Sequence, residues 1–183
     1  LEQQKIFWPD LIMSSNNSAA IIGWPNIQDQ ISRPGVMLYG SSPFISKNHN
    51  SHTLKPVMTL ISKIISIHTV NASESIGYGE SWIAEQPTRV GIVAMGYGDG
   101  YPRHAKEGTP VIIGEQRYGI VGSVAMDMIS VDIGANEHNI KVGDRVTMWG
   151  PELPVEEIAL CADTIPYELL CNITPRVSYE YQP

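Results

Sequence analysis

The sequence predicts a mainly β fold, with a C-terminal β-barrel-like domain that carries short helices. A strand–helix–strand remnant of an α/β (TIM-type) barrel is expected before it. Two observations predict this arrangement. Short β-branched runs recur roughly every 8–12 residues in the later part of the chain, with glycine turns between them. The composition also changes near residue 50, after a polar stretch, so we expect one domain in residues 1–50 and another in residues 51–183.

The first domain is expected to contain two strands around a short helix. Residues 1–8 have the composition of a helix end, and the apolar run at 9–14 is typical of a buried strand. Residues 15–25 read as a loop that enters a helix with Ser or Asn at its cap. Residues 31–40 form a second strand-like run, interrupted by Pro-Gly, and residues 41–54 read as a polar linker. An α/β barrel needs eight such units in about 250 residues, so two units cannot close one.

The second domain is expected to be built from short strands that follow one another along the chain. The predicted strands are VMTLISKIISIHTV (57–70), TRVGIVAM (88–95), TPVIIG (109–114), YGIVGSVAM (118–126), MISVDIG (128–134), DRVTMWG (144–150) and RVSYEY (176–181). Residues 155–164 follow a proline and carry acidic residues early, which predicts a helix. A second short helix is expected at 167–174.

Composition limits the class of protein. The chain has 183 residues, of which 43% are apolar, and a net charge of −7, which argues against nucleic acid as a partner. No apolar run approaches the roughly 20 residues of a membrane span, and the first ten residues do not resemble a signal peptide. Cys161 and Cys171 do not have a zinc-ligand spacing, and we expect a buried, reduced pair in a cytoplasmic protein. His49 and His52 lie in the polar linker, so no metal site is expected.

Several residues in the first domain could bind an anionic cofactor. Ser18 lies in a loop before a helix, and Gly35 and Val36 follow the end of a predicted strand. In α/β barrels a cofactor phosphate is bound by such loops, through hydroxyl and backbone N–H groups. Arg33 carries a permanent positive charge beside them. Alternatively, a capping serine, a turn glycine and a strand-end salt bridge explain the same residues without any ligand.

Tyrosine stands between two glycines twice, at Tyr78 and at Tyr97. The flanking glycines free the backbone and can expose the phenol. A phenol has a pKa of about 10, so it becomes a useful base only beside an unusually acidic carbon–hydrogen bond. Alternatively, each ring packs over a neighbouring strand. Met126 and Asp127 are expected at the end of a strand, where Asp127 could bind turn amides and Met126 could belong to the core.

The order of these motifs resembles alanine racemase over almost the whole chain. The strings that carry the resemblance are NSA, RPGVMLYG, IGYGESW, GYGDGYPR, VGSVAMDM and YELL. The resemblance implies that residues 1–50 are the last part of a barrel that binds pyridoxal 5′-phosphate (PLP), and that residues 51–183 are the C-terminal β domain of such an enzyme. It also implies interconversion of L-alanine and D-alanine, which supplies D-alanine for cell-wall peptidoglycan.

The resemblance gives the anion-binding candidates of the first domain a cofactor-binding role. Ser18 and the backbone of Gly35 and Val36 would bind the phosphate, with Asn17 beside it. The hydroxyl of Tyr167 would reach the same phosphate, and Arg33 would face the pyridine nitrogen and keep it neutral, because an arginine cannot give up its proton.

The residues in and near the two Gly-Tyr-Gly motifs, together with Met126 and Asp127, would act on the substrate. By resemblance, Tyr78 is the base that acts on L-alanine, opposite a lysine on the other face. Tyr97 lines the substrate entrance, with Arg103 nearby. The backbone N–H of Met126 binds the substrate carboxylate, and Asp127 braces that turn.

Three further expectations follow from the resemblance. The β domain of one subunit would reach over the barrel of its partner, so a homodimer would share its active sites. None of Lys47, Lys55 or Lys63 lies in the sequence context of the family's cofactor lysine, so we expect the chain to be a fragment that is inactive alone. Ser123 stands where some members have arginine. Two other readings stay open, namely a racemase for serine or another small amino acid, and a non-catalytic β module that binds a partner.

Overall fold

We analysed a computed structural model of the chain. It describes all residues except 1–6, 9, 25, 27–29, 45–53 and 183. The chain forms two compact units, Leu1–Val57 and Met58–Pro183. Each unit is described by itself below.

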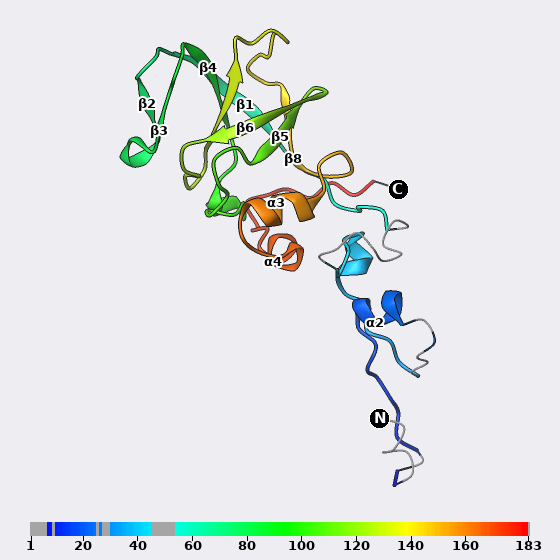
Figure 1. Ribbon diagram of the computed structural model, residues 1–183. Coiled ribbons are helices and arrows are strands. Elements are labelled where there is room, and N and C mark those ends of the chain that lie inside the picture. Colours follow the sequence, from blue (N-terminus) through cyan, green and yellow to red (C-terminus); the bar gives the residue numbers. More distant parts are fainter. Residues whose placement is uncertain (1–6, 9, 25, 27–29, 45–53, 183) are drawn as a thin grey trace. The chain divides into compact units, whose positions relative to one another are not determined.

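The second unit is a closed six-stranded antiparallel barrel (Figure 1). Its strands are β1 (Leu60–Val70), β4 (Thr88–Val93), β5 (Pro110–Ile113), β6 (Gln116–Val121), β7 (Ile129–Gly134) and β8 (Arg145–Trp149). They pair in the order β1-β4-β7-β6-β5-β8, and β8 pairs with β1. A small hairpin of β2 (Ser75–Ile76) and β3 (Trp82–Ile83) stands beside the barrel.

The long first strand closes the barrel because it pairs with two neighbours. The first half of β1 pairs with β8 and the second half pairs with β4. The register shifts between Leu60 and Ile61 and again between Ile64 and Ser66. Such irregularities bend a strand, as closure of a sheet into a barrel requires.

The barrel interior is filled largely by β-branched side chains, which alternate with partly buried residues in β7. In β7 every second residue is buried, beginning with Ile129. The most deeply buried aliphatic residues include Ile64, Val93, Val111, Ile120, Val131 and Val146. This alternation confirms the predicted mainly β fold and the six barrel strands expected between residues 57 and 150.

Two short helices, α3 (Val155–Cys161) and α4 (Pro166–Cys171), pack against each other at one end of the barrel (Figure 1). The first turn of α3 carries Glu156 and Glu157, as the sequence indicated. The predicted strand at 176–181 is wrong, because these residues form a turn and an irregular segment. Closure of the barrel explains this, since every strand already has two partners and no edge is left to pair with. Within the described residues, no helix has the length and apolar character needed to cross a membrane.

The first unit contains α2 (Ser18–Gly23) and a 3₁₀ turn, η1 (Val36–Tyr39). The strands expected at 9–14 and 31–40 are wrong in the described part of those ranges, where one parallel bridge joins Asn17 to Arg33. Pro34 offers no N–H for a ladder there. Phe7 and Trp8 are not helical, the rest of 1–8 lies outside the described residues, and so does most of the linker at 41–54.

Candidate active site

The second Gly-Tyr-Gly motif forms a tight turn between β4 and β5, which we call the Gly96 turn (residues 96–100). Its centre is the 3₁₀ helix η4 (Tyr97–Asp99). The Gly96 N–H donates to the Asp99 carboxylate at 2.9 Å, which closes the turn. Gly100 has a φ of +102°, and a Cβ there would lie 2.2 Å from the Asn172 carbonyl oxygen. The motif therefore needs glycine for its backbone conformation and for close contact.

The loop between β6 and β7 lies directly against the Gly96 turn. We call it the Met126 loop (residues 122–128). The Tyr97 N–H donates to the Ala125 carbonyl at 3.0 Å, and the Gly98 N–H donates to the Met126 carbonyl at 2.8 Å. A Cβ on Gly96 would lie 2.3 Å from the Met126 carbonyl oxygen. The fold thus brings together Tyr97 and Met126, which the sequence separates by almost thirty residues.

Met126 and Asp127 lie within this loop rather than at the end of a strand, because β6 already ends at Val121. The Met126 side chain is 55% exposed, so the core alternative for this residue is wrong. No described residue accepts a hydrogen bond from the Met126 N–H, which leaves one donor unpaired on an exposed loop. The loop is closed by Ala125 N–H donating to the Met128 carbonyl. Bracing of this turn by the exposed Asp127 stays a prediction.

The first Gly-Tyr-Gly motif is the tip of the β2–β3 hairpin. We call it the Gly77 turn (residues 77–81), and it contains the 3₁₀ helix η3 (Tyr78–Glu80). Gly77 and Gly79 have φ values of +84° and +72°, and a Cβ on Gly79 would meet nothing within 4 Å. The tip is therefore open around Gly79. The side chain of Tyr78 lies outside the part of the chain that the structure describes.

The Met126 loop also contacts the Gly77 turn. A Cβ on Gly77 would lie 3.6 Å from the Ser123 nitrogen, and the Ser81 and Ser123 hydroxyls are 3.5 Å apart. One end of the Met126 loop thus meets the first motif and the other end meets the second. A hollow of about 420 Å³ adjoins it, lined by Ile65, Ser66, His68, Gly77, Ile92, Ser123, Ala125, Met128 and Ser130. Ser66 and His68 form a hydrogen bond of 3.0 Å in this hollow, although His68 stands in no recognisable sequence motif.

The Tyr97 ring stays accessible beside a cation. Its side chain is 39% exposed, and the Arg103 guanidinium carbon lies 5.8 Å from the ring centroid. That distance suits a cation–π contact. The predicted proximity of Arg103 to Tyr97 is present, while its role at a substrate entrance stays a prediction.

In the first unit, the Ser18 hydroxyl accepts hydrogen bonds from backbone N–H groups about seventeen residues later in the chain. Its hydroxyl is buried and accepts from the Gly35 N–H at 2.8 Å and from the Met37 N–H at 3.4 Å. No described residue accepts from the Val36 N–H between them. A hydroxyl and converging N–H groups are the donor set that a phosphate uses.

Two further candidates flank this point in the first unit. Asn17 caps α2 by accepting from the Ala20 N–H at 3.0 Å. Arg33 is exposed and donates to the carbonyl and the hydroxyl of Ser14, so the strand-end salt bridge considered for it is not formed among the described residues. Tyr167 belongs to α4 in the second unit and is 41% exposed.

The remaining candidates are metal-ligating side chains and the two cysteine thiols. Among the described residues, no three side chains of His, Cys, Asp or Glu lie where they could hold a metal ion. Cys161 and Cys171 are both free thiols, but the expected burial of the pair is wrong, because Cys161 is only partly buried and Cys171 is exposed. His49 and His52 lie outside the described residues.

Comparison with known proteins identifies the family. Residues 57–181 match the family described as "Alanine racemase, C-terminal domain". The chain belongs to this family. The matched residues include both Gly-Tyr-Gly motifs, the Met126 loop and α4, so the resemblance drawn from the motifs is confirmed.

Curated alanine racemases match the chain over nearly its whole length. One from Shewanella amazonensis is 51% identical over 162 residues, which are 88% of this chain and 44% of that protein. Another from Nitrosococcus oceani is 50% identical over 169 residues, or 92% of this chain and 47% of that protein. The chain thus spans about half the length of these alanine racemases.

Solved alanine racemase structures share the fold. The biosynthetic alanine racemase from Pseudomonas aeruginosa has a TM-score of 0.89 at 42% identity, covering 99% of this chain and 51% of that one. The alanine racemase from Acinetobacter baumannii has a TM-score of 0.87 at 40% identity, covering 96% of this chain and 49% of that one.

Proposed function

We propose that this chain supplies half of the active site of a PLP-dependent alanine racemase, which interconverts L-alanine and D-alanine. The observation that carries the proposal is the Met126 loop, which contacts both Gly-Tyr-Gly turns in a chain of the alanine racemase family. Residues identified from separate motifs thereby lie on one surface, which includes the unpaired backbone N–H of Met126.

The residues of the first unit fit the phosphate of PLP. The Ser18 hydroxyl and the N–H groups of Gly35, Val36 and Met37 converge and carry no charge that would repel an anion. Asn17 would lie beside them, and Tyr167 of the second unit would add its hydroxyl. Arg33 would donate to the pyridine nitrogen. When bound, PLP withdraws electrons from the amino acid and makes its α-hydrogen acidic.

Tyr78, in its deprotonated phenolate form, would take the α-hydrogen of L-alanine as a proton and become a neutral phenol. A phenol has an ordinary pKa of about 10, and its phenolate can serve as the base because the α-hydrogen is acidified at the same time. In the reverse direction the same oxygen returns a proton to that face. The opposite face requires a second base, which the family resemblance assigns to a lysine in the other half of the enzyme.

The second unit would also bind and orient the substrate. The unpaired Met126 N–H would donate to the substrate carboxylate, since a hydrogen bond to a charged group is stronger than one to a neutral group. The Tyr97 ring and the Arg103 guanidinium would narrow the entrance. Asp127 would brace the loop.

The exposure of these groups favours a shared site. Tyr97 and Met126 are respectively 39% and 55% exposed, although a reacting centre must exclude water. In the proposed homodimer, the barrel of the partner subunit covers them. The enzyme would work in the cytoplasm, where its D-alanine feeds peptidoglycan synthesis.

Complementation tests this proposal. The chain is produced together with the N-terminal half of the Shewanella amazonensis relative, and racemisation is followed for alanine and for serine in the presence of PLP. We expect alanine to be racemised at least tenfold faster than serine, because one added hydroxyl changes pocket binding by about 1–3 kcal/mol. The chain alone and the N-terminal half alone are the controls and should be inactive.

Two outcomes would contradict the proposal. Faster turnover of serine would move the assignment to another amino-acid racemase. A soluble complex that binds PLP and racemises neither amino acid would favour the non-catalytic module.

A further inference from the structure

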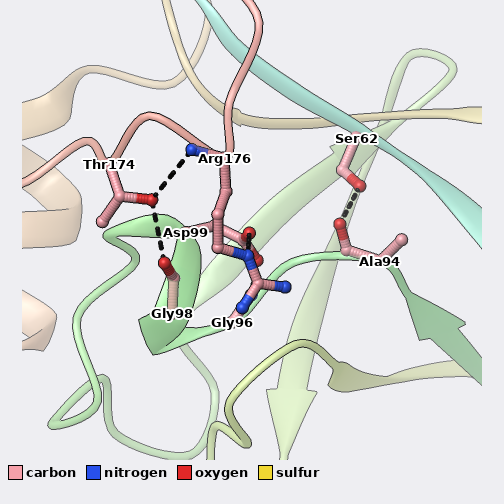
Figure 2. A network of polar contacts seen from close by, with 7 residues as sticks. All are labelled: Ser62, Ala94, Gly96, Gly98, Asp99, Thr174 and Arg176. Carbon is pink, nitrogen blue, oxygen red and sulfur yellow. Dashed lines mark hydrogen bonds and ion pairs between the residues drawn. The ribbon is translucent and has the colours of Figure 1, made fainter.

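A second set of contacts, besides those of the Met126 loop, holds the Gly96 turn. Asp99 uses one carboxylate oxygen to accept from the Gly96 N–H and the other to pair with the Arg176 Nε at 3.1 Å. The Asp99 side chain is only 13% exposed, whereas that of Arg176 is 51% exposed. Figure 2 shows the Arg176 side chain beside the Gly96 turn.

Thr174 binds the same turn twice. Its hydroxyl donates to the Gly98 carbonyl at 2.8 Å (Figure 2). Its backbone N–H donates to the Asp99 carbonyl at 3.1 Å. The side-chain bond joins residues 76 positions apart in the sequence. We call Asp99, Thr174 and Arg176 the clamp.

Gly98 links the clamp to the Met126 loop. Its carbonyl accepts from Thr174, and its N–H donates to the Met126 carbonyl at 2.8 Å. The two hydrogen bonds lie on either side of the Gly98 Cα, so the position of Gly98 depends on both Thr174 and the Met126 loop. The carbonyl that accepts from the Gly98 N–H belongs to Met126, whose own N–H has no partner among the described residues.

Three segments of the chain meet in close contact at Gly98. A Cβ on Gly98 would lie 2.6 Å from the Arg176 Nη1 and 2.9 Å from the Met126 carbonyl oxygen. The Ser62 hydroxyl also binds the Ala94 carbonyl at 2.6 Å, which fixes the strand that leads into the turn (Figure 2). A movement of Thr174 or Arg176 is therefore transmitted through the turn to the Met126 loop.

We propose that Thr174, Asp99 and Arg176 are positioning residues that orient the Met126 N–H toward the substrate carboxylate. The inference rests on the proposed racemase function and assigns these three residues a part in substrate binding. They touch neither substrate nor cofactor and act through the Gly96 turn.

The clamp makes a distinctive kinetic prediction. Thr174→Val removes the hydroxyl donor at nearly constant volume, and Thr174→Ser retains it. In the complemented enzyme, Thr174→Val should raise KM for alanine roughly three- to tenfold and change kcat less than twofold, because a carboxylate contact made equally in the ground and transition states affects binding alone. Thr174→Ser should restore KM to within about twofold.

Two control experiments separate positioning from general stability. Arg117→Gln breaks an exposed ion pair with Glu157 far along the chain from the clamp, and it should leave KM unchanged. Asp99→Asn combined with Arg176→Gln should raise KM no more than the stronger single variant, since the two residues act as one pair.

Amide hydrogen exchange on the 183-residue chain gives a readout that needs neither activity nor cofactor. We expect Thr174→Val to speed exchange of the Gly98 N–H about fivefold, and Thr174→Ser to leave it unchanged. If the complemented wild-type chain is inactive, the proposed function fails while this exchange still tests the clamp. Unchanged Gly98 exchange in Thr174→Val, or a fall in kcat at constant KM, overturns the inference.

Discussion

Tyr97 and Tyr101 stand four residues apart in opposite environments. The Tyr97 side chain is 39% exposed, whereas Tyr101 is 1% exposed and stacks on Trp149 at 6.1 Å. No described residue bonds to the Tyr101 hydroxyl. Burial, and to a smaller degree the charge of the nearby Cys161 thiolate, raise the pKa of Tyr101. One phenol is thus held neutral in the core while the other remains at the surface.

Tyr101→Phe tests the cost of that buried hydroxyl. At pH 7 we expect the free energy of unfolding to be unchanged or up to about 1 kcal/mol higher, because a polar group without a partner is removed. The folded-state pKa is raised, so the stabilising linkage is complete below the unfolded pKa of about 10 and is lost as the pH rises above it. Urea unfolding at pH 7 and pH 10.5 measures both effects. An equal alkaline loss in the variant and the wild type would show that Tyr101 does not contribute.

Some of the site residues could be identified from the sequence, and others could not. Tyr97 and Met126 were identifiable because they stand in distinctive motifs, and the fold brings their loops together. Thr174 and Arg176 were missed because their contacts with the Gly96 turn span most of the domain. Asp99 was also missed, although an aspartate three residues after Gly96 is a local signal for a turn cap.

Among the elements, the barrel strands were predictable from short β-branched runs separated by glycine turns. Buried residues alternate with partly buried ones throughout β7, whereas β5 and β6 show no such alternation. The strand expected at 176–181 failed because barrel closure, a property of the whole sheet, leaves it no partner. The hairpin of β2 and β3 escaped notice because two-residue strands show no periodicity.

Alanine substitution of two glycines separates close contact from backbone conformation. Gly96 has a φ that any residue adopts, yet its Cβ would strike the Met126 carbonyl at 2.3 Å. Gly79 has a φ of +72° but open space around it. We expect Gly96→Ala to lower the free energy of unfolding by about 2–3 kcal/mol and Gly79→Ala by about 1 kcal/mol. Thermal and urea unfolding of the chain measure both, and a larger loss at Gly79 would contradict the packing described for the Gly96 turn.

For the molecule as a whole, the barrel serves to hold three loop segments at one surface. The Gly96 turn and the Met126 loop connect strands of the closed sheet, and the Gly77 turn is the tip of the separate β2–β3 hairpin that contacts the Met126 loop. The family match covers this unit, and the chain spans about half the length of its curated relatives. Composition and charge could exclude nucleic acid as a partner, but only the motifs in their order pointed to an amino-acid racemase.

The most direct test of the account is exchange of the α-hydrogen in D₂O, measured separately on L-alanine and D-alanine with the complemented enzyme carrying Tyr78→Phe. Steady-state racemisation cannot assign the face, because an equilibrium constant of about one makes both directions lose equally in kcat/KM. We predict that exchange from L-alanine falls at least about 100-fold, as for loss of a general base, while exchange from D-alanine falls less than about tenfold. Equal losses for the two enantiomers, or full retention of both, would contradict the assignment of Tyr78 to the L face.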